Sequence, residues 1–293
     1  MLTYRWLGTA GLEFTLENYT LLIDPFFTRP PARALVTQAR VRSNAELCAR
    51  HAPRADAVLV THSHYDHILD VPVILQQTGA RAYGSPNACA LLALHGLPAE
   101  RITCVRVGDR FRLGPFEVEV LPHHHTDIPF ARLFNGPLPA HLRGAAAAPQ
   151  GTAAVANAPG AHIHLPLRLS DYRMDACYSF RIQAAGQALL VGNEPTPADA
   201  LFIAPYQPPS LLEATLRASA ARLVIPIHWD DFTQPLTQPL RPMLLTRAQG
   251  LRGRFAVLRR MDLSAFTALA RATLPAARVH VPALFEPYPL DGA

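Results

Sequence analysis

The sequence predicts an α+β protein in which two β-sheets stack face to face and helices cover their outer faces, a four-layer αββα sandwich. Two observations predict this. Short apolar segments typical of strands come in two batches along the chain, and helical segments follow each batch. Hydrophobic residues make up 49% of the 293 residues, which is ample for a buried core. The length suits one large domain or two small ones, and we expect a single domain over residues 1–293.

The first batch of strands opens the chain, with turn residues between its members. The predicted strands are residues 3–7, 12–16, 19–23, 57–60, 80–84, 102–105, 111–113 and 116–121. Between them, residues 32–52 are expected to be helical or irregular, and residues 68–77 and 86–95 to be helices. Ser85 has the character of an N-cap for the last of these, with Pro86 at its first position.

The second batch of strands follows a stretch of different composition. Residues 127–172 are rich in Ala, Pro and Gly, and we interpret them as an insertion or lid over a site. Within this stretch, residues 144–160 approach low complexity and favour a disordered surface loop. The later predicted elements are strands at residues 178–182, 188–191, 200–204 and 223–227, and helices at residues 209–220 and 262–273.

Composition narrows the possible classes of function. Charged residues are 17% of the chain, too few for a disordered protein. The formal net charge is +5 and all 27 basic residues are arginine, so a mildly basic surface would favour anionic substrates. No block of arginines is dense enough to predict nucleic-acid binding.

Four cysteines are spread along the chain without Cys-x-x-Cys spacing: Cys48, Cys89, Cys104 and Cys177. This spacing predicts neither a zinc ribbon nor a disulfide framework, and we expect reduced thiols in a cytoplasmic protein. The first residues lack the charged and apolar regions of a signal peptide. No apolar run is long enough to predict a membrane span.

The segment with the most chemistry is residues 61–67, Thr-His-Ser-His-Tyr-Asp-His, directly after the apolar residues 57–60. Imidazole and carboxylate are the ligands of Zn²⁺ and its first-row neighbours. His62 and His64 point to the same side of an extended backbone, whereas Asp66 and His67 fall where the chain turns. One loop can therefore supply ligands to two adjacent metal ions.

Two more strand ends carry histidines. His123, His124 and His125 follow the strand predicted at residues 116–121, and His228 follows the one at residues 223–227. Three adjacent histidines cannot all reach one ion from one strand, because side chains alternate faces, and His123 shares a face with His125. We expect the aspartates at positions 230 and 231 to orient His228 or arginine side chains.

The pattern His-x-His-x-Asp-His after a buried strand resembles the metallo-β-lactamase superfamily. Leu-Ile-Asp-Pro at residues 22–25 also resembles it, which implies a place for Asp24 near the metal loop; a simple strand-ending turn is the alternative. Pro-Ile-His-Trp at residues 226–229 resembles the branch of UlaG-like lactonases and N-acyl-phosphatidylethanolamine phospholipase D-like hydrolases. The resemblance implies a four-layer fold with two adjoining metal sites, one from His62, His64 and His125, the other from Asp66, His67 and His228.

One position departs from the family pattern. The superfamily's bridging Asp corresponds to Asn193, in Leu-Leu-Val-Gly-Asn-Glu at residues 189–194. Asparagine is neutral and offers one weak carbonyl oxygen, so it cannot hold two cations together as a carboxylate does. Glu194 could take its place as a ligand, the second ion could bind weakly, or the site could work with one ion. An inactive relative is compatible with all three.

The resemblance implies a metal-dependent hydrolase, with activated water attacking a phosphodiester or another ester-type bond. Asp66 would orient the nucleophile and His228 would complete the catalytic site. A UlaG-like lactone hydrolase and a non-catalytic metal-binding or sensor protein are the alternatives, while redox use of a di-iron site suits the motif less well. We expect Zn²⁺, as one or two ions, although Mn²⁺ and Fe²⁺ also suit these ligands.

The expected partner is a small molecule, with an anionic group among the possibilities, and a homo-oligomer is compatible with the sequence. Arginines in the predicted insertion would meet an anionic substrate or be solvated surface charges: Arg132, Arg143, Arg168 and Arg173. His162 and His164 in the same stretch form a second His-x-His pair, without a neighbouring carboxylate or strand, and are weaker metal candidates.

Overall fold

The computed structural model describes residues 1–126, 131–146, 165–245 and 259–290. Its first sheet has seven strands in the described residues, in the order β16-β1-β2-β3-β4-β5-β6. These strands are β1 (Thr3–Gly8), β2 (Gly11–Leu16), β3 (Tyr19–Ile23), β4 (Ala57–Leu59), β5 (Arg81–Gly84), β6 (Ile102–Cys104) and β16 (Pro287–Pro289). Pairing is antiparallel from β16 to β3, where short turns connect β1, β2 and β3, and parallel from β3 to β6.

The second sheet also has seven strands among the described residues, in the order β15-β12-β11-β10-β9-β8-β7. They are β7 (Arg110–Leu113), β8 (Phe116–Pro122), β9 (Tyr178–Ala184), β10 (Gln187–Val191), β11 (Ala200–Ile203), β12 (Leu223–Pro226) and β15 (Arg278–Val279). This sheet is antiparallel from β7 to β10 and parallel from β10 to β15. A separate pair joins β13 (Leu244–Leu245) to β14 (Arg259–Arg260).

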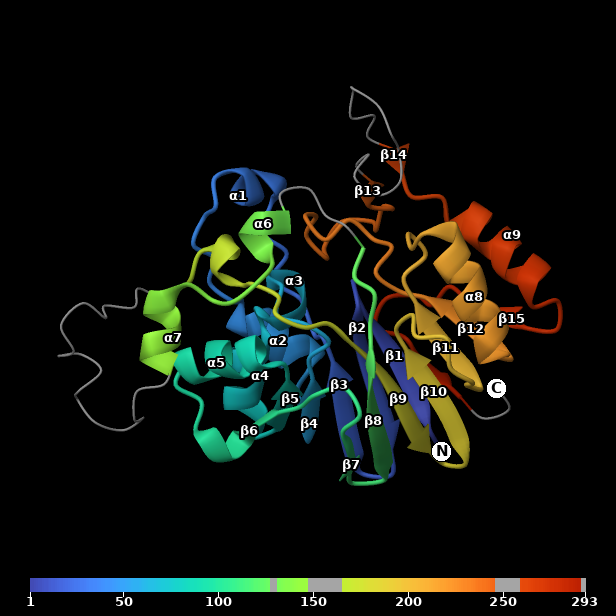
Figure 1. Cartoon of the computed structure of the whole chain (residues 1–293), viewed down its shortest axis with the longest axis horizontal. Helices are drawn as coiled ribbons and strands as arrows, with labels where there is room; N and C mark the ends of the chain where they lie inside the picture. The colour runs from blue at the N-terminus through green and yellow to red at the C-terminus, as the bar shows by residue number, and fades with distance from the viewer. Residues whose placement is uncertain (127–130, 147–164, 246–258, 291–293) are drawn as a thin grey trace.

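Helices cover the outer faces of both sheets. They are α1 (Ala32–Val36), α2 (Ala45–His51), α3 (Tyr65–Ile68), α4 (Val71–Thr78), α5 (Pro86–Leu94), α6 (Ala131–Phe134), α7 (Ala140–Ala146), α8 (Pro209–Ser219) and α9 (Leu263–Thr273), with 3₁₀ turns η1 (Ala99–Arg101) and η3 (Leu169–Asp171). Figure 1 shows α2, α4 and α5 on the side of the first sheet and α8 and α9 on the side of the second. The four-layer αββα sandwich predicted from the sequence is confirmed.

The main core lies between the two sheets. Phe14 of β2 meets Phe202 of β11 edge-on, with ring centroids 5.2 Å apart, and Tyr4 of β1 packs on the same Phe202 ring at 5.2 Å. Smaller cores fill the outer layers, where Leu22 and Val58 of the first sheet pack with helix residues. The central strands β4, β11 and β12 are buried on both faces, so the loops that follow them begin from fixed positions.

The sequence located β1 to β12 to within two residues at either end, whereas β13, β14, β15 and β16 were not predicted. The predicted cap of α5 is confirmed, because Ser85 accepts a hydrogen bond from the Ala88 N–H at 3.3 Å. The helix predicted at residues 68–77 corresponds to α4, which begins later, at Val71, and a separate short helix, α3, ends at Ile68. Pro72 has no N–H to continue a helix. At the junction, the buried Asp70 carboxylate accepts from the Phe27 N–H at 2.6 Å, which anchors the turn to another segment.

The predicted insertion is described only in part. Helix α6, helix α7 and residues 165–172 belong to it, whereas residues 127–130 and 147–164 lie outside the described residues, together with His162 and His164. The expectation of a disordered loop is wrong for residues 144–146, which end α7. Beyond residue 146 that expectation falls outside the described part of the chain.

The expectation of four reduced thiols is also wrong for one pair. Cys89 in α5 forms a disulfide with Cys104 at the end of β6, and their Cα atoms are 6.0 Å apart. Helix α5 packs against β6, which brings together two cysteines that are 15 residues apart in sequence. Cys48 and Cys177 are free thiols. None of the helices in the described ranges combines the length and the apolarity that a bilayer crossing requires.

Candidate metal centre

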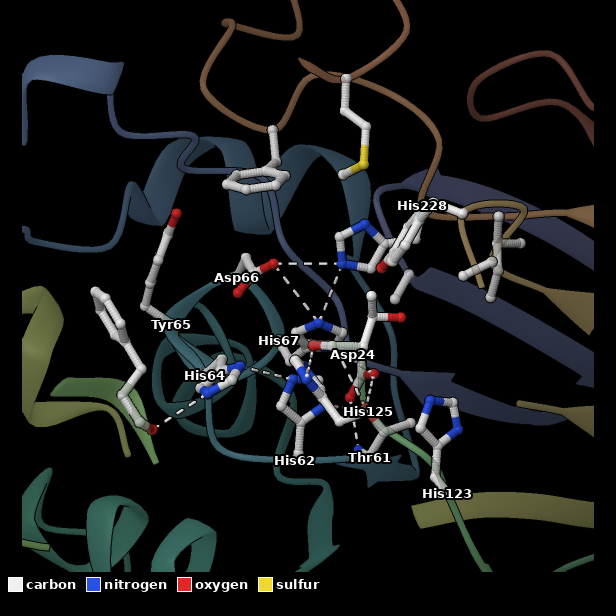
Figure 2. A pocket seen from close by; sticks show the side chains of 18 of the residues that line it. Asp24, Thr61, His62, His64, Tyr65, Asp66, His67, His123, His125 and His228 are labelled. Atoms are coloured by element: carbon white, nitrogen blue, oxygen red, sulfur yellow. Dashed lines mark hydrogen bonds and ion pairs between the residues drawn. The ribbon is translucent and has the colours of Figure 1, made fainter. Parts of the chain in front are cut away.

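The histidine-rich segments meet at one end of the sandwich, around a cavity of about 410 Å³. Three strand ends bring them there: the loop after β4, the chain after β8 and the chain after β12. Figure 2 shows these side chains converging at the floor of the cavity. Six of the predicted ligands form two groups, which we call the first cluster (His62, His64 and His125) and the second cluster (Asp66, His67 and His228).

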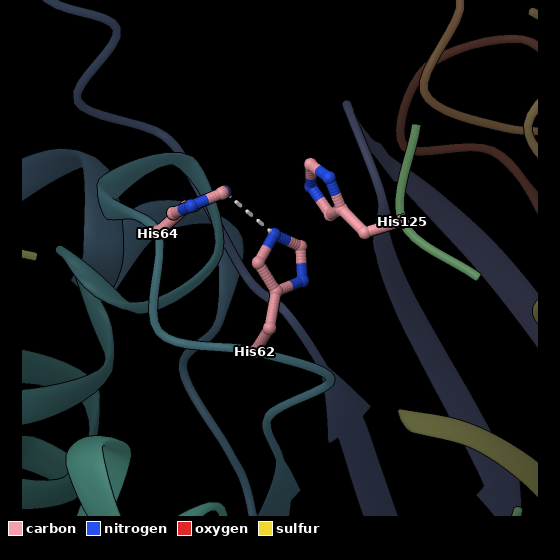
Figure 3. Close-up of side chains that lie close together, drawn as sticks. All are labelled: His62, His64 and His125. Atoms are coloured by element: carbon pink, nitrogen blue, oxygen red, sulfur yellow. Dashed lines mark hydrogen bonds between the residues drawn. The ribbon is translucent and has the colours of Figure 1, made fainter. Parts of the chain in front are cut away.

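In the first cluster the ligand-type atoms of the three histidines lie within 4.8 Å of one another. His62 and His64 come from one loop and His125 from another segment (Figure 3), and His62 Nε2 lies 3.1 Å from His64 Nδ1. His125 Nδ1 donates to the Thr126 carbonyl at 2.7 Å, which leaves its Nε2 as the lone-pair nitrogen. This arrangement presents three imidazole lone pairs to one small region.

The second cluster is a tight triangle of donor atoms (Figure 2). His228 Nε2 is 3.3 Å from Asp66 Oδ2 and 3.3 Å from His67 Nε2, and the third side, from His67 Nε2 to Asp66 Oδ2, is 3.6 Å. Ligands held about 2.0–2.2 Å from a tetrahedral zinc ion are themselves about 3.3–3.6 Å apart. The triangle therefore has the dimensions of one face of a metal coordination shell.

Asp24 fixes the orientation of His67 from below the cluster. Its Oδ2 accepts from His67 Nδ1 at 2.7 Å, so the opposite nitrogen, Nε2, faces the cavity. The Thr61 N–H donates to Asp24 Oδ1 at 2.8 Å, and the Thr61 hydroxyl also donates to this carboxylate. Asp24 thus lies next to the histidine loop, as predicted, and its buried carboxylate contacts His67 directly.

His228 is held by contacts between the two sheets. The backbone N–H of His228 donates to the Thr9 carbonyl at 2.6 Å, and the backbone N–H of Thr9 donates to Asp230 Oδ1 at 2.8 Å. Asp230 forms a buried ion pair with Arg29 at 2.6 Å. Thr9, Asp24 and His228 have φ values of 51°, 44° and 56°, a backbone region that non-glycine residues rarely adopt. Such strain is concentrated at functional sites because the surrounding contacts must enforce it.

The surroundings keep the imidazoles of the first cluster neutral. Burial, together with the neighbouring histidines, lowers the pKa of His62 well below its ordinary value and that of His125 to about 3. Burial raises the pKa of Asp66, but the adjacent His67 and His228 outweigh it and hold the pKa well below its usual range. Neutral imidazole and ionised carboxylate are the forms that bind metal ions.

Asn193 and Glu194 are not among the residues that line the cavity, and Glu194 belongs to neither cluster in the described part of the chain. The Asn193 side chain instead engages the backbone of His124: its Oδ1 accepts from the His124 N–H at 3.0 Å and its Nδ2 donates to the His124 carbonyl at 2.7 Å. His123, the alternative to His125, lines the cavity with its Nδ1 3.1 Å from Ser179 Oγ.

The arginines predicted to meet an anionic substrate do not line the cavity in the described residues. Arg173 donates from Nε to the Asn135 carbonyl at 3.2 Å, and the side chain of Arg132 lies outside the described part. Asn135 in turn places its Oδ1 3.2 Å from His64 Nε2. Sequence reasoning missed Asn135 and the Arg29 partner of Asp230, because neither stands in a motif and both contacts join distant segments.

Known proteins resemble this chain in sequence and in fold. Residues 19–154 match the family model of the beta-lactamase superfamily domain. A protein from Carboxydothermus hydrogenoformans named "UPF0173 metal-dependent hydrolase" is 31% identical over 120 residues. That match covers 41% of this chain and 46% of the relative, so it spans about half the length of the curated protein.

Solved structures match over almost the whole chain. Igni18, described as a novel metallo hydrolase from Ignicoccus hospitalis, has a TM-score of 0.58 at 13% identity, covering 98% of this chain and 97% of its own. The metallo-beta-lactamase fold protein YhfI from Bacillus subtilis has a TM-score of 0.52 at 13% identity, covering 99% and 100%. At these identities the likeness shows the fold.

Proposed function

We propose that this chain, which carries a metallo-β-lactamase superfamily domain, is a metal-dependent hydrolase whose centre holds one or two divalent cations. The observation that carries the proposal is the pair of adjoining clusters at the cavity floor, with three nitrogen donors in one and two nitrogens and a carboxylate oxygen in the other. The relative from Carboxydothermus hydrogenoformans, named a metal-dependent hydrolase, supports it.

The donor set fits a metal. The surroundings lower the pKa of His62, His64 and His125 and that of Asp66, which favours neutral imidazoles in the first cluster and an ionised carboxylate in the second. The second cluster also has the spacing of a coordination face. A divalent cation there would supply Lewis acidity and lower the pKa of water to about 7. Zn²⁺ stays our prediction for the ion, with Mn²⁺ and Fe²⁺ as alternatives for the same ligands.

The chain's own residues would position the reactants. Asp66 carries its Oδ2 at the cavity floor, 3.3 Å from His228 Nε2, where it can accept a proton from an attacking water and hold that water toward the substrate. His67 keeps its orientation through the Asp24 contact, and His228 through its backbone bond to Thr9. Asp66 and His228 therefore remain our candidates for the catalytic residues.

For the bond that is cleaved, the sequence resemblance favours a phosphodiester or another ester-type bond, with a lactone as the alternative. A non-catalytic metal-binding or sensor protein is the second candidate function. The neutral Asn193 favours this second candidate. Its side chain forms hydrogen bonds with the backbone of His124 and does not line the cavity, so it supplies no bridging carboxylate. A single domain over residues 1–293, a cytoplasmic location and a small-molecule partner stay predictions of the sequence.

The test is metal content together with turnover. Protein purified without chelators should contain one or two ions per chain by elemental mass spectrometry, and it should hydrolyse a panel of p-nitrophenyl esters and bis(p-nitrophenyl) phosphate. His62→Ala and His228→Ala should lose both properties, whereas His141→Ala, which changes an exposed histidine in α7 away from the cavity, should keep both. Metal binding without hydrolysis across the panel would favour the sensor.

A further inference from the structure

The cavity above the clusters has apolar walls. They are formed by residues from α1, from α6 and from the chain that follows His228: Leu35, Val36, Leu133, Phe134, Phe232 and Leu244. The imidazole and carboxylate side chains of the two clusters gather at the floor (Figure 2). A molecule bound here would therefore meet metal-type ligands at one end and hydrocarbon along its length.

The rim of this cavity exposes large apolar side chains to solvent. Val36 is 85% exposed, Leu133 is 50% exposed and Leu244 is 45% exposed, although they come from three separate segments. Scattered apolar residues on a surface are ordinary, but several around one cavity mouth indicate that the surface is covered by a ligand. The apolar surface therefore extends from the cavity wall to the solvent-exposed rim of its opening.

The same lining is poor in positive charge. Among the described residues that form the cavity there is no arginine, although the chain has 27 basic residues and a net charge of +5. A phosphodiester is anionic. The wall offers no cationic side chain to pair with its charge, so only groups at the clusters could do so. An uncharged substrate loses little hydration when it enters apolar surroundings, whereas a charged one loses much.

Building on the proposed function, we propose that the substrate is an uncharged carboxylic ester with an apolar acyl chain, which lies along the wall from α1, α6 and Leu244 while its carbonyl faces the clusters. In the reaction, water adds to the carbonyl carbon and the bond from that carbon to the alcohol oxygen breaks. One proton of the water passes to the departing alcohol, and the products are a carboxylic acid and an alcohol.

Chain length gives the first test. Each methylene that leaves water improves binding about fourfold when it is fully buried. Since the rim is open, we expect kcat/KM to rise by roughly tenfold or more from p-nitrophenyl acetate to the octanoate, measured below the micelle concentration. We also expect the octanoate to exceed bis(p-nitrophenyl) phosphate. A flat or falling series, or preference for the phosphodiester, overturns the inference.

Substitutions at the rim give the second test. The double variant Val36→Ser with Leu244→Ser changes two exposed side chains, and it should lower the ratio of octanoate to acetate kcat/KM by roughly fivefold or more. Val281→Ser is the matched control, because Val281 is 42% exposed and does not line the cavity, and its ratio should stay at the wild-type value. An unchanged ratio in the double variant contradicts the proposed wall.

Binding without catalysis separates the two proposals. The neutral apolar dye N-phenyl-1-naphthylamine should fluoresce on binding to metal-free wild-type protein and to Val281→Ser, and bind less to the double variant. If metal-loaded protein cleaves neither esters nor the phosphodiester, the proposed function fails and this inference falls with it. If esters are cleaved without preference for the longer chain, or the double variant binds the dye as well as wild type, only the substrate inference fails.

Discussion

The side chain of Asn193 pairs with the backbone of His124 as a neighbouring strand would, accepting from its N–H at 3.0 Å and donating to its carbonyl at 2.7 Å. His124 stands directly before His125, so this pair of bonds fixes the backbone from which a first-cluster imidazole projects. The backbone of Asn193 is itself held in place. Its backbone N–H donates to Ser179 Oγ at 3.2 Å, and its backbone carbonyl accepts from the Thr215 hydroxyl at 2.7 Å.

The variant Asn193→Asp tests whether the side chain at position 193 serves the hydrogen bonds with His124 or the binding of a metal ion. A carboxylate cannot donate to the His124 carbonyl, so two acceptor oxygens would face each other and one hydrogen bond would be lost. We expect unfolding free energy to fall by about 1–3 kcal/mol, by chemical denaturation, without a gain in metal content. A second bound ion with undiminished stability would show instead that the carboxylate reaches the cavity.

Asp24→Asn should weaken metal binding. The change removes the charge that orients and polarises His67 through Nδ1. Losing such a partner typically costs about 10–100-fold in metal affinity. Competition titration against a chelator measures it, with Asp56→Asn as the control, because Asp56 accepts from the Thr20 N–H at 2.7 Å and lies outside the cavity lining. Equal affinities in the two variants would refute the role of Asp24.

The Arg29–Asp230 ion pair should be a large contributor to stability when only one partner is removed. Both side chains are at most 1% exposed, so Asp230→Ala leaves a buried guanidinium unpaired, at a cost of about 3–5 kcal/mol. Arg112→Ala in the exposed pair with Glu117 should cost less than about 1 kcal/mol. Urea unfolding compares the two, and similar losses would contradict the expected difference.

His95 should make the fold sensitive to acid. Burial lowers its pKa to about 4. Between that value and its ordinary pKa of 6.5, the unfolded chain binds a proton that the folded chain does not, so stability falls as pH decreases through this window. His95→Gln should remove roughly 1–2 kcal/mol of the loss between pH 6.5 and pH 5, measured by urea unfolding of metal-free protein. An identical pH dependence in wild type and variant would count against this account.

The sequence was most informative where spacing alone determines geometry. His62, His64, Asp66 and His67 follow a short buried strand. Alternation places His62 and His64 on one side, and the turn that follows directs Asp66 and His67 to a second point. Strands β1 to β12 were located because most of them are short apolar runs bounded by turn residues, whereas the later short strands β13 to β16 were missed.

What the sequence could not supply were contacts between distant segments. Asn193 meets His124 across 69 residues, and the arrangement depends on how β8 and β10 flank β9. The pairing of Arg29 with Asp230 and of Cys89 with Cys104 likewise follows from which elements pack together. Between α3 and α4, the Asp70 carboxylate contacts the backbone of Phe27, 43 residues earlier in the chain. None of these contacts leaves a periodic pattern.

Both clusters combine the loop after β4 with residues from the second sheet, and His228 meets His67 across 161 residues. During synthesis, the early histidines therefore leave the ribosome long before the residues that complete either coordination shell. Neither sheet has all its strands until the segment with β15 and β16 has been synthesised, because β16 pairs with β1 in the first sheet and β15 with β12 in the second. A chain that ends before His228 lacks one ligand-type residue of the second cluster, so that cluster is completed only late in synthesis.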